Sequence, residues 1–278
     1  MQAGSGLYFV FLLCVFFLYW ICAPSRIARL TVILIANFLF CARYGLFYIV
    51  LIPACAFVDY LIGLGLARFR AALLRRLLVT ISIAVNLALL IGSRHMGWFL
   101  SQGWIPQHRA GDWDWVFPLG LSFYTFQALT YTIDLYRGDA PATPSMLAHL
   151  CSVSFFPTLQ AGPITRVADL LKQLAKPPAL SRESGGRAFF LIATGVLKKA
   201  LIADFLAENL VNRVFDTPNL YSGGQALLAV YAYSLQLYFD FSGYTDIARG
   251  AGLLLGIELP RNFDRPYLSA NIAEFWRR

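Results

Sequence analysis

Residues 44–67 read YGLFYIVLIPACAFVDYLIGLGLA, residues 68–76 read RFRAALLRR, and residues 77–92 read LLVTISIAVNLALLIG. Two long apolar runs separated by four arginines in nine residues are typical of membrane-spanning helices joined by a cytoplasmic loop. The first run also carries Pro53, which is expected to kink it, and a carboxylate, Asp59. The pattern predicts an integral membrane protein with polar groups inside its apolar segments.

The composition of the whole chain supports this interpretation. Of its 278 residues 58% are hydrophobic and only 14% are charged, whereas a soluble domain carries about 25% charged residues. The net charge of +8 is concentrated between apolar runs, and no basic stripe is interleaved with exposed aromatics, which argues against nucleic-acid binding. The five cysteines form no CxxC pair, so zinc and redox motifs have no support.

Further apolar blocks extend the prediction to an all-α, multi-pass transmembrane bundle in a single membrane domain, residues 1–278. These blocks are residues 7–23, 30–42, 116–136, 188–210 and 225–259. The last is long enough for a full helix plus a second, broken element.

The block 30–42 is short for a span of about 20 residues. Either the segment is tilted, or Arg29 and Arg43 lengthen it by reaching to the interface. Residues 93–115 are interpreted as an external loop with interfacial tryptophans. If the first three blocks cross the membrane and residues 68–76 are cytoplasmic, the N-terminus is periplasmic.

Residues 146–180 are apolar but broken by Pro157, Gly162-Pro163 and Pro177-Pro178. A single straight span is therefore not expected here. Irregular backbone at membrane depth persists only when it is buried in protein or lines a cavity, so a re-entrant or interfacial segment fits better.

Polar residues in two stretches admit both a functional and a structural interpretation. Gly120, Tyr124, Gln127 and Tyr131 share one helical face, which could line a polar channel or join helices. The Pro- and Gly-rich stretch around Gln160 could be a substrate loop or a packed turn.

A third stretch, residues 236–249, reads QLYFDFSGYTDIAR. Asp240 and Asp246 are costly inside a membrane, so they should face a cavity or a partner. Asp246 and Arg249 are spaced to pair on a helix. The stretch could form a hydrophilic reaction chamber, a buried network that holds helices together, or an ion pathway.

Several segments, taken in order, resemble a known family. They read PLGLSFYTFQ (118–127), YTIDLYRG (131–138), FP…AGP (156–163), LKK…IAD (197–204), QLYFDFSGYTD (236–246) and NFDRPY…NI…EFWRR (262–278). Their order and spacing resemble the membrane-bound O-acyltransferases, specifically the bacterial alginate O-acetylase branch. The teichoic acid D-alanyl transferases are similar, though less closely.

The resemblance implies a helical fold around a membrane tunnel, with residues 1–115 as N-terminal spans and residues 116–278 as the start of the core. It implies transfer of acetyl from a cytoplasmic donor, with acetyl-CoA as the candidate, to an exopolysaccharide such as alginate. The implied partners are the lipid bilayer of the bacterial inner membrane, periplasmic acetyltransferase proteins and the polysaccharide. No bound cofactor or metal and no nucleic acid are expected.

The resemblance also suggests site residues. Tunnel-wall candidates are Gln127, Gln160, Asp240, Ser242, Tyr244 and Asp246, and candidates near the donor entrance are Asn271, Glu274 and Arg277.

The family's Trp-Arg-Arg motif continues with Trp-His, and its catalytic histidine lies beyond the position of Arg278. The chain thus resembles the N-terminal portion of the family pattern and is expected to be inactive alone. His95, His108 and His149 match neither family histidine and are expected to be solvated or satisfied. The alternatives are an ion or solute transporter or channel, and a non-catalytic remnant that only scaffolds partners.

Overall fold

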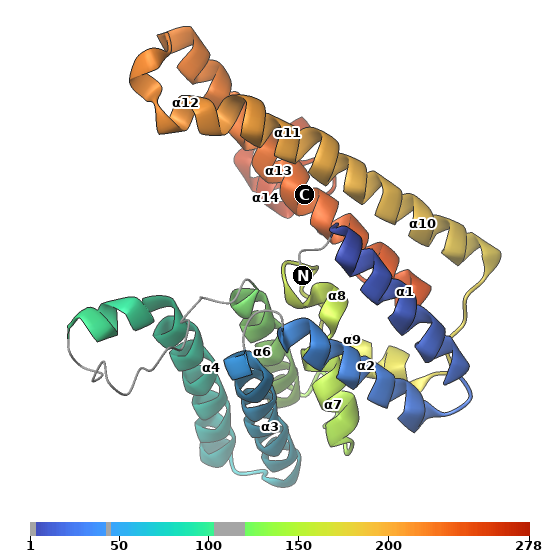
Figure 1. Cartoon of the computed structure of the whole chain (residues 1–278). Helices are drawn as coiled ribbons and strands as arrows, with labels where there is room; N and C mark the ends of the chain where they lie inside the picture. The colour runs from blue at the N-terminus through green and yellow to red at the C-terminus, as the bar shows by residue number, and fades with distance from the viewer. Residues whose placement is uncertain (1–3, 43–45, 103–119) are drawn as a thin grey trace. The chain divides into compact units, whose positions relative to one another are not determined.

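The computed structural model describes residues 4–42, 46–102 and 120–278, and every element assigned within these ranges is a helix (Figure 1). The chain forms two compact units. Unit 1 comprises residues 15–160 and 164–178, and unit 2 comprises residues 2–14, 161–163 and 179–278. The expected boundary near residue 115 falls outside the described residues, and the single-domain organisation stays a prediction.

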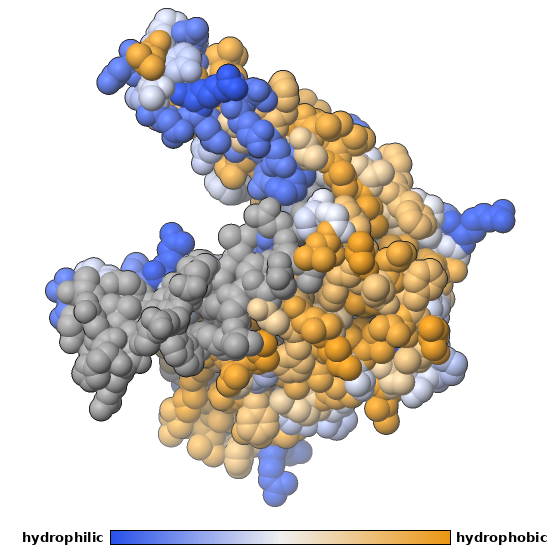
Figure 2. Space-filling view, viewed as in Figure 1, coloured by the Kyte–Doolittle hydropathy of each residue, from blue (hydrophilic) through white to orange (hydrophobic). Residues whose placement is uncertain are grey.

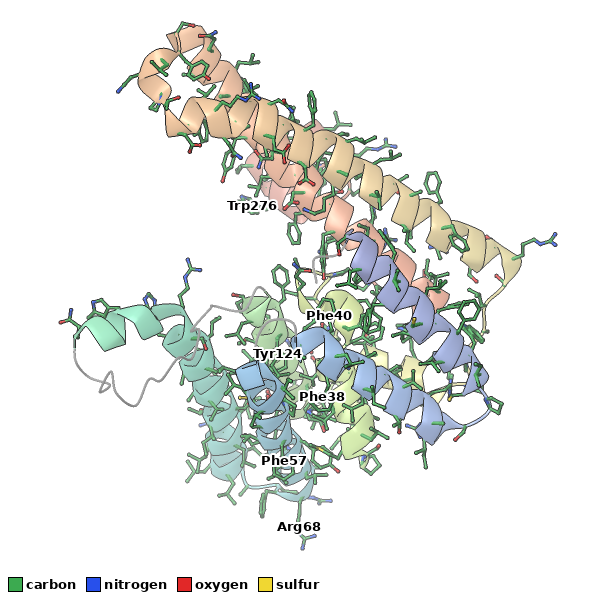
Figure 3. The ribbon with its side chains drawn as sticks, viewed as in Figure 1. Phe38, Phe40, Phe57, Arg68, Tyr124 and Trp276 are labelled. Atoms are coloured by element: carbon green, nitrogen blue, oxygen red, sulfur yellow. The ribbon has the colours of Figure 1, made fainter. Side chains whose placement is uncertain are left out.

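Unit 1 is built from helices predicted largely from their apolar runs. They are the second part of α1 (Gly6–Ile21), α2 (Arg26–Ala42), α3 (Leu46–Arg68), α4 (Ala72–Ser101), α6 (Leu121–Arg137), α7 (Met146–Val153), α8 (Phe156–Leu159) and α9 (Val167–Ala175). Helices α3, α4 and α6 pack against one another, and α7 packs against α2, α3 and α9. Phe40 and Tyr124 lie in this core, whereas Phe57 is half-exposed (Figure 3).

Within the described residues, two segments are long and apolar enough to cross a membrane, residues 49–68 of α3 and residues 72–95 of α4. Helix α1 and the segment 146–159 are shorter apolar helices. The three short helices α7, α8 and α9 confirm that residues 146–180 do not form one straight span.

Three expectations about unit 1 need correction. Residues 93–101 continue α4 rather than forming a loop, and only residues 69–71 separate α3 from α4. Arg29 does not reach to an interface: it is 5% exposed and donates from Nη1 to the Lys176 carbonyl at 3.1 Å. A backbone carbonyl thus replaces the solvent that the sequence had suggested for this guanidinium. Arg43, Trp104, Trp113 and Trp115 lie outside the described residues.

Arg75 ties three helix ends together. From the first turns of α4 it donates to the carbonyls of Leu66 at 2.5 Å, Leu135 at 3.1 Å and Tyr136 at 2.7 Å. These carbonyls belong to the last turns of α3 and α6, where the helix dipoles favour a cation. The C-terminal ends of α3 and α6 therefore meet the N-terminal end of α4.

Unit 2 begins with a long helical segment from residue 182 to residue 216. It consists of α10 (Arg182–Val196), the π-helical η1 (Leu197–Ala203), α11 (Asp204–Leu206), the π-helical η2 (Ala207–Val211) and α12 (Asn212–Asp216). A short 3-10 turn, η3 (Pro218–Leu220), leads to α13 (Gly223–Leu254). The remaining elements are η4 (Pro266–Leu268) and α14 (Ile272–Arg277).

The start of each long helix of unit 2 is fixed by a serine. Ser181 and Ser184 form a capping box at α10, and Ser222 and Gln225 form one at α13. Each box satisfies backbone N–H groups that the first helical turn leaves unpaired. The predicted block 225–259 is one unbroken helix as far as Leu254, so the expected second broken element is wrong. Its polar residues follow the helical repeat and need no break.

Helices α10 and α13 cross closely and antiparallel, because glycines occupy the contact. A Cβ atom added at Gly243 would lie 2.7 Å from the Gly195 carbonyl oxygen, and one at Gly250 would lie 2.7 Å from the Ala188 carbonyl oxygen. Small residues at a helix interface allow such close backbone approach in membrane proteins. The close crossing brings the polar residues of η1 against those of α13.

The visible face of α10 is mostly hydrophobic and becomes hydrophilic toward α12 (Figure 2). Exposed apolar side chains along this segment include Phe189, Phe190, Leu197, Leu201 and Phe205. Such a row suits contact with lipid better than contact with water.

Candidate functional site

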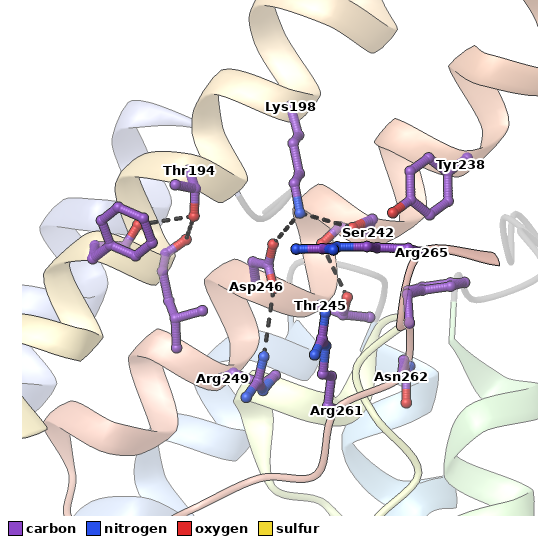
Figure 4. A pocket seen from close by; sticks show the side chains of 13 residues that line it. Thr194, Lys198, Tyr238, Ser242, Thr245, Asp246, Arg249, Arg261, Asn262 and Arg265 are labelled. Atoms are coloured by element: carbon purple, nitrogen blue, oxygen red, sulfur yellow. Dashed lines mark hydrogen bonds and ion pairs between the residues drawn. The ribbon is translucent and has the colours of Figure 1, made fainter. Parts of the chain in front are cut away.

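Two adjacent lysines of η1 meet the two carboxylates of α13. Lys198 donates from Nζ to Asp246 Oδ2 at 2.5 Å and to Ser242 Oγ at 3.0 Å (Figure 4). Lys199 forms an ion pair with Asp240 and a longer one, 3.7 Å, with Asp204. Each charge that was costly inside an apolar segment therefore has an opposite partner in the neighbouring helix.

The two pairs differ in burial. The side chains of Lys198 and Asp246 are 29% and 14% exposed, whereas that of Asp240 is 51% exposed. Asp246 also pairs with Arg249 at 3.7 Å, which confirms the pairing predicted from their spacing. Ser242 and Tyr244 are buried, and Ser242 joins the inner pair by accepting from Lys198.

The inner pair forms part of the wall of a pocket with a volume of about 400 Å³. The pocket is lined by α10, η1, α13 and the segment that follows α13, all in unit 2. Its charged and polar lining residues are Thr194, Lys198, Tyr238, Ser242, Thr245, Asp246, Arg249, Arg261, Asn262 and Arg265. The volume falls within the range of about 300–1,000 Å³ of small-molecule sites.

Gln127 and Gln160 lie in unit 1 and are not among the residues that line this pocket. Gln127 is 4% exposed, donates from Nε2 to the Ser152 carbonyl at 2.8 Å and accepts from the Thr158 hydroxyl at 3.3 Å. These bonds join α6 to α7 and α8, as helix-joining polar residues do. Gln160 is also buried, and its backbone packs against Gly120, where an added Cβ would lie 2.6 Å from Gln160 Cα. Their role as tunnel wall stays a prediction.

Glu274 and Arg277 belong to α14, and Asn271 precedes its first residue. Asn271 Oδ1 accepts from the Glu274 N–H at 2.8 Å and so caps the helix. Glu274 accepts from the Ala270 N–H at 2.9 Å and pairs with Arg278 at 2.7 Å. The Ala270 N–H and then the Arg278 guanidinium hold the pKa of Glu274 below its usual range. Arg277 is exposed, and the proposed donor entrance remains untested.

Neither His95 nor His149, the histidines within the described residues, forms an ion pair with a carboxylate. His149 is fully buried in α7, where Nε2 bonds the Ala56 carbonyl at 3.1 Å and the ring lies 4.4 Å from that of Tyr131. The expectation of a satisfied histidine therefore holds for Nε2. His95 is exposed on α4, and His108 lies outside the described residues.

Several functional candidates are missing from the set predicted from sequence. Lys198 and Lys199 could have been found, because two lysines inside an apolar run need two anionic partners and Asp240 and Asp246 offer them. Arg261 and Arg265 follow the helix in a loop, and nothing in their spacing indicates that the chain folds back onto α13.

Comparison with known proteins explains the set of motifs. Residues 137–278, which include all of η1, α13 and the pocket lining, match the model of the MBOAT, membrane-bound O-acyltransferase family. The chain belongs to the membrane-bound O-acyltransferase family. The family is membrane-bound, in agreement with the two apolar helices long enough to cross a membrane.

The relatives of this chain differ in what their names say they act on. It is 36% identical over 264 residues to a protein of Pseudomonas aeruginosa named probable alginate O-acetylase AlgI, covering 90% of this chain and 49% of that protein. It is 30% identical over 273 residues to the peptidoglycan O-acetyltransferase of Helicobacter pylori, covering 88% and 52%. It is 32% identical over 192 residues to the teichoic acid D-alanyltransferase of Bacillus subtilis, covering 65% and 47%. The chain spans about half the length of these relatives.

Proposed function

We propose that this chain is the N-terminal portion of an enzyme that acetylates a cell-surface polysaccharide. The observation that carries the proposal is the 36% identity to an alginate O-acetylase across 90% of the chain. The similarity to a D-alanyltransferase covers a smaller share, 65%, so acetyl is the favoured acyl group. An alginate-like exopolysaccharide is the proposed acceptor, and periplasmic acetyltransferase proteins are the proposed partners.

The proposed donor is acetyl-CoA on the cytoplasmic side of the bacterial inner membrane. Arg68, Arg70, Arg75 and Arg137 all lie at the end of unit 1 where Arg75 joins three helices. A concentration of arginine at one end of spanning helices favours a cytoplasmic location for that end. A periplasmic N-terminus and a multi-pass arrangement follow from the same assignment.

The proposed acetyl transfer needs a general base. A histidine of the full-length protein would take the proton of the acceptor hydroxyl, whose oxygen attacks the thioester carbonyl while the thiolate leaves. The present chain would supply tunnel wall through Gln127, Gln160, Asp240, Ser242, Tyr244 and Asp246. The paired charges of Asp240 and Asp246 suit this supporting role better than an ion pathway, because each carboxylate has a lysine partner.

A transfer assay with membrane vesicles tests the proposal. Vesicles containing the full-length protein and its periplasmic partners receive radiolabelled acetyl-CoA on the cytoplasmic face and alginate on the other. We expect label on the polysaccharide, and none from vesicles containing only residues 1–278. Label that stays on the donor side with the full-length protein contradicts the acetyl-transfer proposal. Full activity of residues 1–278 contradicts only the requirement for a further histidine.

A further inference from the structure

The pocket of unit 2 contains more positive than negative charge. Among its lining residues Lys198, Arg249, Arg261 and Arg265 are cationic and only Asp246 is anionic. Asp264, which pairs with Arg261 at 3.1 Å, adds one more carboxylate from just outside the lining. Even with it, the cations outnumber the carboxylates by two.

These cations converge rather than spread over the surface. Figure 4 shows Arg249, Arg261 and Arg265 directed toward the place where Lys198 meets Asp246. Arg249 is 17% exposed in its side chain, and its Nε is buried without a hydrogen-bond partner among the described residues. A buried donor without an acceptor is costly, so an acceptor is expected from a ligand.

The backbone conformation of Arg265 is a second indication that the pocket binds a ligand. Its φ of 51° lies in the left-handed region, and it is the only residue other than glycine in that region within the described parts of the chain. Residues with a side chain rarely adopt this conformation, and such outliers concentrate at functional sites. Here the conformation directs an additional guanidinium into a pocket that already holds excess positive charge.

Apolar side chains line the rest of the pocket. Phe190, Leu191 and Phe263 line it, and Phe190 is 68% exposed. From Phe190 the exposed apolar row of α10 and η1 continues through Leu197 and Leu201. A ligand that fits both the cationic and the apolar lining carries an anionic head and an apolar body.

We propose that this pocket binds the phosphate group of an anionic phospholipid, whose acyl chains lie along the exposed apolar row of α10. Arginines bind phosphate oxygens through pairs of parallel hydrogen bonds, and basic pockets between membrane helices bind anionic headgroups. The inference does not rest on acyl transfer, because it concerns binding of the surrounding lipid.

The test measures lipid binding to the full-length protein in detergent by native mass spectrometry. Phosphatidylglycerol is titrated in competition with phosphatidylcholine, first with the unaltered protein. Arg261→Gln and Arg265→Asn each remove one pocket cation, and asparagine tolerates the left-handed backbone at position 265. We expect each to weaken phosphatidylglycerol binding about fivefold, and the double variant more.

The matched control is Arg182→Gln, which removes one exposed arginine at the far end of α10, about 24 Å along the helix from Lys198. It should bind phosphatidylglycerol as the unaltered protein does. An equal loss in the control, or no loss in either pocket variant, would overturn the proposal.

A second measurement identifies the source of the phosphate and excludes misfolding. The midpoint of thermal unfolding is followed while phosphatidylglycerol or inorganic phosphate is added in neutral detergent. We expect stabilisation by the lipid that is lost in the double variant, whose midpoint without anionic lipid stays near that of the unaltered protein. Equal stabilisation by inorganic phosphate would overturn the lipid assignment in favour of a soluble phosphate ligand.

Discussion

Asp246 and Asp240 differ in how much water reaches them, and this difference should appear in their contributions to stability. Asp246→Asn leaves Lys198 and Arg249 without a charged partner at a mostly buried position, which should lower the free energy of unfolding by about 1–3 kcal/mol. Asp240→Asn removes a half-exposed pair and should cost under about 1 kcal/mol. Thermal unfolding of both variants in detergent checks the order, and equal losses would contradict it.

Asp59 offers a second test at the scale of a single residue. It is fully buried between α3, α4 and α6, where it accepts from Ser82 Oγ at 2.7 Å and from Asn86 Nδ2 at 2.9 Å. Asp59→Ala removes the acceptor that the two donors share, although Ser82 Oγ keeps Thr132 Oγ1 at 3.0 Å and Asn86 Nδ2 keeps the Ser82 carbonyl at 3.0 Å. Loss of the shared acceptor should lower the free energy of unfolding by about 1–3 kcal/mol. Asp59→Asn keeps an acceptor in place and is the control. If the two variants unfold at the same temperature, the hydrogen bonds contribute little.

The sequence predicts which residues are unusual better than it predicts their partners. Asp240, Asp246 and Gln127 stand out because each is polar within an apolar run. Their partners lie far along the chain, since Lys198 and Asp246 are 48 positions apart and Gln127 bonds carbonyls that carry no side-chain signal. Long-range contacts of this kind depend on how helices cross, which one sequence does not contain.

At the scale of elements, the crossing of α10 and α13 depends on glycine. Gly243→Ala places a Cβ 2.7 Å from the Gly195 carbonyl oxygen and 3.0 Å from the Lys199 nitrogen. We expect the helices to separate, with a loss of about 1–3 kcal/mol in the free energy of unfolding. Gly224→Ala in the first turn of α13, where no atom lies within 4 Å, should be neutral or stabilising by about 0.5–1 kcal/mol. Similar midpoints for both variants would refute the close-contact argument.

Helix existence follows from apolar runs, but helix ends do not. Helix α10 begins at Arg182, before its apolar run, because Ser181 and Ser184 cap it. Helix α4 continues through Arg94 and His95, where the sequence suggested a loop. Capping and the lengthening of helices by polar residues are local effects that hydrophobicity alone misses.

For the whole molecule, the arrangement of arginines predicts an orientation. In a cysteine-free version, Arg70→Cys lies in the connection between α3 and α4, and Gln102→Cys follows the far end of α4. Thirty residues of helix are about 45 Å long, enough to separate the two sites across a bilayer. A membrane-impermeant maleimide should label Cys at position 102 in spheroplasts and Cys at position 70 only after lysis. The reverse pattern would place the arginines outside.

Family membership was accessible from sequence because the motifs of residues 117–278 are ordered and specific. The pocket of unit 2 could not be predicted from the sequence, because Arg261 and Arg265 line it from a loop whose path the sequence does not indicate. Composition established the membrane class, and motif order established the family. The arrangement of side chains in three dimensions required the structure.

The number of residues in the π-helical segments η1 and η2 determines where the following side chains lie around the helix. A π turn holds about one more residue than an α turn. Removing one residue from 197–203 would therefore rotate the side chains of the following helical residues by about 100° around the helix axis. A substitution in this segment should change stability little. A single deletion changes the rotational position around the helix of the following residues relative to Lys198. The midpoints of thermal unfolding of Ala200→Ser and of the Ala200 deletion test this, and we expect the deletion to lower the midpoint more. Equal midpoints would show that the rotational position of the following residues is unimportant. Evolution should therefore change this segment by substitutions and not by insertions or deletions.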